Sequence, residues 1–103
     1  MHVITRKRFD EAIKSFPNDA KAIDDLFRAL KRGKFKTPEE IKKAFPSYDN
    51  FKYKDKWNVI DINGGNLRMI AYVDLTTQQV FVKHIVTHAE YEKITDKHRK
   101  GKK

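Results

Sequence analysis

The chain has 103 residues, enough for one domain with one modest core and too few for a second globular unit. It has no cysteine, which excludes disulfides, thiolate metal sites and cysteine nucleophiles. Its 23 lysines and arginines outnumber its 14 acidic residues, and the net charge of +9 favours a polyanionic partner, nucleic acid first. Because no apolar run could span a bilayer and no signal-peptide pattern opens the chain, we expect a cytoplasmic protein that does not bind membranes.

The first part of the chain predicts two helices that follow a short N-terminal strand. Apolar residues recur at helical spacing from Phe9 to Phe16, and Pro17 ends that helix. Asn18 or Asp19 is suited to cap the second helix, whose apolar stripe is expected to face the core.

A third, short helix begins at the capping box Thr37-Pro38-Glu39-Glu40 and ends at Pro46. The loop that follows, residues 47 to 56, alternates aromatic and basic side chains, which stack on bases and bind phosphates in single-strand RNA sites. An ordinary covering loop explains the same residues equally well. The candidate RNA-binding residues of this loop are Lys52, Tyr53 and Lys54.

The second half of the chain predicts three strands, over residues 57–62, 67–75 and 80–87. The segment Asn63-Gly64-Gly65-Asn66 predicts a hairpin, since glycine accepts the positive φ of a type I′ turn. A short helix then opens at the capping box Thr87-His88-Ala89-Glu90. The elements together predict an α+β fold, with N-terminal helices packed on an antiparallel sheet and a short C-terminal helix.

The last seven residues carry five lysines and arginines and are expected to form a frayed tail. We therefore predict one domain over residues 1–96 and a basic tail over residues 97–103. Candidate contacts of this tail to RNA phosphates are Lys97, Arg99 and Lys100.

The hairpin register sorts the strand residues into two faces. If Gly64-Gly65 is the loop, Ile62 faces Leu67 and Asp61 faces Arg68. One face is nearly all apolar and is expected to pack on the helices: Ile60, Ile62, Leu67, Met69, Ala71, Val73, Leu75, Val80, Val82, His84 and Val86. The other is the expected RNA-facing surface: Trp57, Val59, Asp61, Arg68, Ile70, Tyr72, Asp74, Phe81, Lys83, Ile85 and Thr87.

The sorting of the last strand depends on the length of the second loop. A two-residue loop puts Lys83 on the face of Arg68 and makes His84 a core histidine, whereas a three-residue loop reverses both placements.

The residue types available for chemistry are histidine, lysine, arginine and tyrosine. No histidine pair at ligand spacing has a nearby carboxylate, and the sequence has no Walker loop and no Gly-x-Ser-x-Gly elbow, so we expect neither metal nor cofactor. These side chains suit metal-free RNA cleavage. A base takes the proton of the 2′-OH, cations stabilise the phosphorane, and an acid protonates the departing 5′ oxygen.

Five residues are candidates for that reaction. His88 titrates near neutrality and is the candidate base or acid, and Arg68 is the candidate phosphate anchor. Tyr91 lies one helical turn beyond His88, with Lys93 close by, and Lys83 is a second cation. Structural alternatives exist: His88 as an ordinary surface histidine, Tyr91 as part of a buried stripe, and Arg68 as the partner of a carboxylate across the hairpin.

Three segments resemble the HigB toxins, within the RelE-like group of RNA endonucleases: Phe45-Pro46-Ser47-Tyr48-Asp49-Asn50-Phe51-Lys52-Tyr53, Gly65-Asn66-Leu67-Arg68 and Val86-Thr87-His88-Ala89-Glu90-Tyr91. The resemblance implies a RelE-like fold, cleavage of mRNA, often on translating ribosomes, and neutralisation by a HigA-like helix-turn-helix antitoxin. It carries over Arg68, His88 and Tyr91 as site residues, whereas Lys83 and Lys93 rest on the predicted geometry alone.

We therefore expect the toxin of a type II toxin–antitoxin pair, a metal-independent mRNA endoribonuclease that inhibits translation and growth. Two alternatives involve no catalysis. One is an RNA- or ribosome-binding module that uses the same basic face, and the other is a structural protein that only pairs with another chain.

Overall fold

The predicted α+β fold is confirmed by a computed structural model, which describes residues 1–52 and 54–101, with side chains up to Arg99. The elements in chain order are β1 (His2–Val3), α1 (Lys7–Ser15), the 3-10 helix η1 (Pro17–Asp19), α2 (Ala20–Arg32), α3 (Pro38–Ala44), β2 (Asp49–Asn50), β3 (Trp57–Ile62), β4 (Leu67–Asp74), β5 (Gln79–Thr87) and α4 (His88–Gly101). Within the described residues, no helix is long and apolar enough to cross a membrane.

The strands form one sheet in the order β1-β5-β4-β3-β2. The three long strands are antiparallel, as predicted, and the first hairpin has the expected register, with Ile62 opposite Leu67 and Asp61 opposite Arg68. Two short edge strands complete it. β1 pairs with β5 in parallel, and β2 pairs with β3 inside a segment that we expected to be loop.

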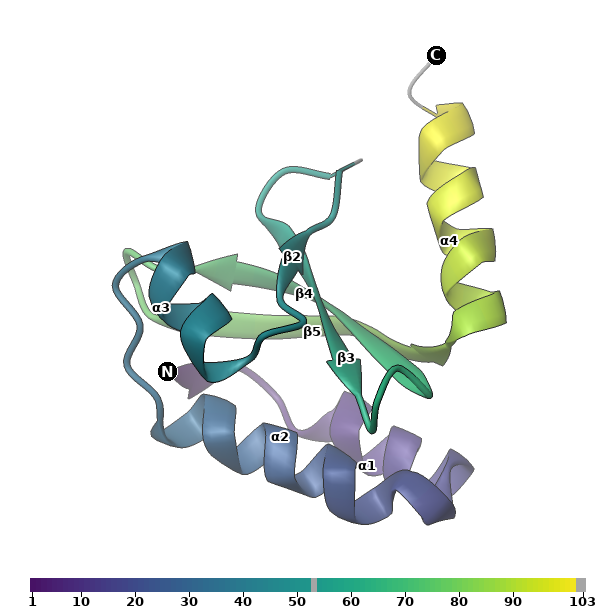
Figure 1. Ribbon diagram of the computed structural model, residues 1–103, viewed down its shortest axis with the longest axis horizontal. Coiled ribbons are helices and arrows are strands. Elements are labelled where there is room, and N and C mark those ends of the chain that lie inside the picture. The colour runs from purple at the N-terminus through teal and green to yellow at the C-terminus, as the bar shows by residue number, and fades with distance from the viewer. Residues whose placement is uncertain (53, 102–103) are drawn as a thin grey trace.

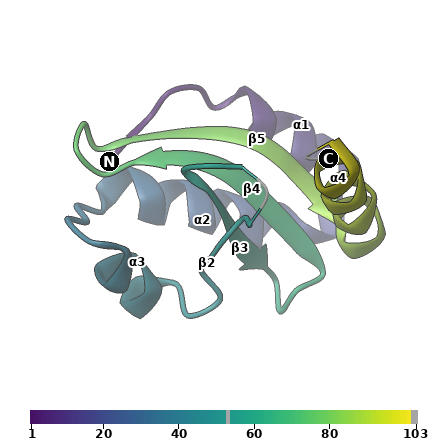
Figure 2. The same cartoon turned by 90° about the horizontal axis from the view of Figure 1, so that it is seen from above.

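The sheet has a covered face and an open face. α1 and α2 lie side by side under one face, whereas α4 rises from the end of β5 on the opposite side (Figures 1 and 2). The main core fills the space between the sheet and the first two helices, and its fully buried members include Phe9, Ile23, Leu30, Leu67, Met69, Val80 and Val82. Ligands therefore reach the three long strands from the open face.

One extra residue in β5 divides this strand into two halves. Ala71 pairs with Val82, but the next residue of β4, Ile70, pairs with His84, so Lys83 forms a β-bulge. Because side chains alternate between the faces of a strand, an inserted residue exchanges the faces beyond it. The predicted facing is confirmed through Val82 and is wrong from His84 onward.

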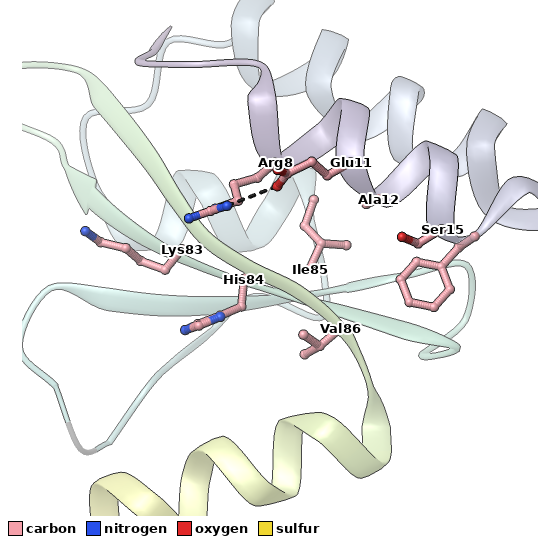
Figure 3. Close-up of a pocket in the computed structure, with 9 residues that line it drawn as sticks. Arg8, Glu11, Ala12, Ser15, Lys83, His84, Ile85 and Val86 are labelled. Carbon is pink, nitrogen blue, oxygen red and sulfur yellow. Dashed lines mark hydrogen bonds and ion pairs between the residues drawn. The ribbon is translucent and has the colours of Figure 1, made fainter.

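The exchange corrects four placements. His84 and Val86 lie on the open face, and Ile85 packs against the main core instead. Thr87 pairs with the buried Leu67 and so also leaves the open face. Figure 3 shows Ile85 directed toward α1 while His84 and Val86 point to the side of α4.

Asp19, one of the two predicted caps of α2, binds a distant turn instead of capping the helix. Asp19 stands at the N-cap but makes no side-chain capping bond. Its buried carboxylate instead accepts hydrogen bonds from Asn63 Nδ2 (2.6 Å) and Asn66 Nδ2 (2.9 Å) in the β3–β4 turn. In that turn Gly64 and Gly65 have φ of 67° and 93°, as the glycine pair predicts. The carboxylate therefore ties the start of α2 to the hairpin that carries Arg68.

The segment expected to be a tail continues α4. Residues 97–101 are helical, and His98 is half-buried, with its ring 5.4 Å from the rings of both Phe51 and Trp57. These contacts hold a helical turn that composition alone suggested would fray.

We predict that Asp19→Ala lowers the free energy of unfolding by about 2 kcal/mol, because two asparagine amides lose their charged acceptor. Urea denaturation measures the change. The matched control is Asp25→Ala on the same α2 helix, where an exposed carboxylate pairs with Lys21, and it should change stability by about 0.5 kcal/mol or less. Equal losses of stability from the two substitutions would contradict a stabilising role for the hydrogen bonds between Asp19 and the two asparagines.

Candidate active site

The first turn of α4 is fixed by the predicted capping box. The backbone amide of Glu90 donates to Thr87 Oγ1 (3.3 Å), and the amide of Thr87 donates to Glu90 Oε1 (3.2 Å). This reciprocal cap sets where α4 begins and places His88 and Tyr91 beside the open face of β4.

Arg68 is the cation at the centre of this region. Its Cζ lies 4.7 Å from the centroid of the Tyr91 ring, and its Nε lies 3.4 Å from Oδ1 of Asp61. The Nε–H is buried and has no hydrogen-bond acceptor among the described residues, since the carboxylate is within ion-pair distance but out of hydrogen-bond geometry. Arg68 is thus held in place by one ring and one carboxylate while its hydrogen-bonding capacity is underused, as an anion-binding arginine requires.

His88 and Arg68 share Tyr91 as a neighbour. The rings of His88 and Tyr91 are stacked, with centroids 6.5 Å apart and an interplanar angle of 23°. Nε2 of His88 lies 3.0 Å from Oε1 of Glu92, an ion-pair partner for the protonated ring. The imidazole is exposed, so a substrate can reach it.

A second, smaller core docks α4 on the open face. Phe51, Val59 and Ile70 are buried there, and Trp57, Tyr91 and Ile94 pack against them. The Phe51 ring lies 5.8 Å from that of Trp57 and 6.4 Å from that of Tyr91. Since Tyr91 belongs both to this core and to the Arg68 group, the packing of α4 fixes the position of the site.

His84 is the functional candidate that the sequence analysis assigned to the core. On the open face its ring lies 6.4 Å from that of Trp57. Burial lowers the pKa of His84 below its usual range, and the charges of Arg8, His98 and Lys83 lower it further. A neutral imidazole among cations is suited to accept a proton.

The lysines nearest the site lie over aromatic rings. Lys83, on the bulge, has its Nζ 4.0 Å from the Phe81 ring centroid and 5.9 Å from that of Trp57. Lys54 Nζ lies 5.7 Å from the centroid of the same Trp57 ring. Lys83 therefore faces the open side, as predicted, although the bulge that carries it was not.

The remaining predicted residues lie farther out. Lys93 is exposed and lies about 200° around α4 from Tyr91, at 100° per residue, so the structure does not bring it to the site. Lys52, Lys97 and Arg99 are exposed, and Arg99 pairs with Asp96. Tyr53 and the side chain of Lys100 lie outside the described residues. Among the described residues, no three histidine or acidic side chains gather as a metal site.

Comparison with known proteins identifies the family to which this chain belongs. A family profile for the HigB toxin, the RelE-like toxic component of a toxin–antitoxin system, matches residues 19–94. The chain belongs to this family. It is 49% identical to the mRNA interferase HigB of Escherichia coli O6:H1 (strain CFT073) over 102 residues, 99% of each chain. It is 40% identical to the mRNA interferase toxin HigB of Escherichia coli K12 over 104 residues, the full length of both.

Some residues in the segments that resemble HigB toxins stabilise the fold. Ser47 Oγ accepts a hydrogen bond from the amide of Asp61 (2.9 Å), and the Tyr48 hydroxyl donates to Asn58 Oδ1 (2.7 Å). Asn66 belongs to the clamp on the Asp19 carboxylate. The other two shared segments supply Arg68, His88 and Tyr91, the groups of the candidate site.

We predict that His84 titrates with a midpoint below 6.5 in the folded protein, measured from its imidazole ¹H–¹³C resonances. Arg8→Gln should raise this midpoint by removing a cation, whereas Lys14→Gln on the same helix should leave it unchanged. The folded state binds this proton less tightly than the unfolded chain. The stability due to neutral His84 is therefore complete above pH 6.5 and declines as the pH falls below it. A midpoint at or above 6.5 contradicts the placement.

Proposed function

We propose that this protein is the mRNA-cleaving toxin of a toxin–antitoxin pair. The proposal is supported by the curated relatives, which are named mRNA interferases, and by the family to which the chain belongs. The observation that carries it is the contiguous group Arg68–Tyr91–His88 on the open face of a strongly basic domain. Such a group combines an anion-binding cation with a proton-transferring ring.

In the proposed reaction, the 2′ oxygen of the RNA attacks the adjacent phosphorus and the P–O5′ bond breaks. Arg68 binds the non-bridging phosphate oxygens and stabilises the charge that develops on them. His88, which has Glu92 as a partner for its protonated form, donates the proton that the 5′ oxygen acquires. Neutral His84 accepts the 2′-OH proton, Tyr91 positions Arg68 and His88, and Lys83 adds positive charge beside the phosphate.

The RNA path extends beyond the cleavage site. Phe51 contacts His98, so Lys52 and Lys54, which follow Phe51 closely in the chain, and the end of α4 lie at the same edge of the open face. We propose that Lys52, Lys54, Lys97 and Arg99 bind RNA phosphates along this edge. Tyr53 and Lys100 stay predicted RNA contacts, and the predicted catalytic role of Lys93 is not part of this proposal.

The biological setting follows from the substrate. We propose that the toxin acts in the cytoplasm on mRNA engaged by ribosomes and that a HigA-like antitoxin neutralises it. The charge of +9 favours association with a ribosome, whose surface is rich in phosphate.

The first test separates chemistry from helix capping. His88→Ala should fold and bind RNA normally yet lose about 100-fold or more in single-turnover cleavage, the usual effect of losing an acid–base group. Thr87→Ala removes the cap one residue away and should cost about 1 kcal/mol of stability with a much smaller effect on the rate. Thermal melting and cleavage assays measure the two quantities.

Bacterial growth provides an independent readout for the same two variants. Induced His88→Ala should no longer arrest growth, whereas Thr87→Ala should, at equal expression. If His88→Ala still arrests growth, His88 does not catalyse cleavage, and the non-catalytic RNA-binding alternative gains support.

The second test concerns the products. We predict that the purified toxin cleaves RNA in EDTA and leaves a 2′,3′-cyclic phosphate or 3′-phosphate, because its own side chains supply acid, base and positive charge. The assay must be free of ribosomes, which need magnesium themselves. Mass spectrometry of the fragments identifies the ends, and 3′-hydroxyl products rule out attack by the 2′-OH.

A further inference from the structure

The outer edge of β5 is unpaired over most of its length. On this outer side β1 pairs only with Gln79 and Val80, and in the described part of the chain no strand pairs with the outer side of β5 from Phe81 to Thr87. A free edge offers a row of backbone donors and acceptors, which natural proteins cover or use to bind another strand.

A groove runs along this free edge. A cavity of about 300 Å³ separates it from α1, with Arg8, Ala12 and Ser15 on the helix wall and residues 83–86 on the strand wall (Figure 3). A slot between a helix and a sheet edge is the arrangement in which extended peptides bind by strand addition.

The groove carries positive charge. Arg8 and Lys83 flank it, and both depress the pKa of His84, which lines it. The acidic side chain in the groove wall, Glu11, is paired with Arg8 at 3.0 Å. An occupant with carboxylates therefore fits this slot better than a neutral or basic one.

We propose that an extended, acidic segment of the antitoxin binds this groove as a sixth strand on the free edge of β5. The inference rests on the toxin–antitoxin assignment and not on the cleavage mechanism. The added strand lies against the bulge, whose Lys83 and His84 side chains reach the open face. Binding at the edge therefore also touches the candidate active site.

Hydrogen exchange of the complex with the cognate antitoxin tests the backbone contact. Alternate amides between Phe81 and Thr87 should become protected when the antitoxin binds, because strand addition consumes their hydrogen bonds. Protection confined to α4 or to the loop at residues 50–56, with no change in β5, would overturn the proposal.

Two pairs of variants test the groove itself. Arg8→Glu should weaken antitoxin binding at least tenfold, whereas Lys14→Glu, with the same change of charge on the same helix, should not. Ser15→Trp fills the groove and should weaken binding similarly, whereas Lys14→Trp should not. Calorimetry measures affinity, and thermal melting verifies that each variant is folded.

The outcomes distinguish this proposal from the proposed catalysis. Of the two groove variants, only Ser15→Trp leaves the charge around His84 unchanged, and it should cleave RNA at the wild-type rate while escaping the antitoxin. Unchanged antitoxin affinity in both variants refutes the groove, whatever the nuclease assays show. If the protein does not cleave RNA but its affinity for the antitoxin still responds to these substitutions, the groove is supported and only the proposed catalysis is contradicted.

Discussion

The single extra residue in β5 is the constraint on which the arrangement of this molecule depends. Because Lys83 is inserted opposite the step from Ala71 to Ile70, the first half of β5 keeps Val80 and Val82 in the main core. The second half presents the other set of side chains to the open face. Without the bulge, Ile85 would leave the core and His84 would enter it, which would bury a titratable ring and expose an apolar one.

The second core makes the site dependent on α4. Tyr91 contacts Arg68, His88 and Phe51, so the cation and the imidazole keep their spacing only while the helix stays docked. This core is small, and α4, which stands out from the sheet (Figure 1), packs on it through Tyr91, Ile94 and His98. Local opening of α4 therefore needs less free energy than global unfolding, and it would separate the proposed catalytic groups without disrupting the main core.

Apolar periodicity and turn chemistry predict the long helices and strands, and the glycine pair predicts the register at Asp61–Arg68. Prediction fails where one inserted residue or one long-range contact decides the structure. The bulge has no glycine or proline to mark it, so His84 was misassigned to the core. Asp19 resembled a cap because local rules ignore the two asparagines of a distant turn. Residue chemistry and family resemblance pointed to Arg68, His88 and Tyr91, whereas only the fold reveals that Tyr91 joins the other two.

The bulge also links the two surfaces that a toxin must manage. A regular strand would keep edge and face independent, since its backbone hydrogen bonds lie in the sheet plane and its side chains stand perpendicular to it. At a bulge the backbone twists, so Lys83 and His84 belong both to the groove beside the free edge and to the face beside Trp57. If an antitoxin strand binds that edge and an RNA phosphate binds that face, as proposed above, the two compete for the same positive charge. Under this proposal, neutralisation requires no large conformational change in the toxin, only an acidic segment that occupies the edge first.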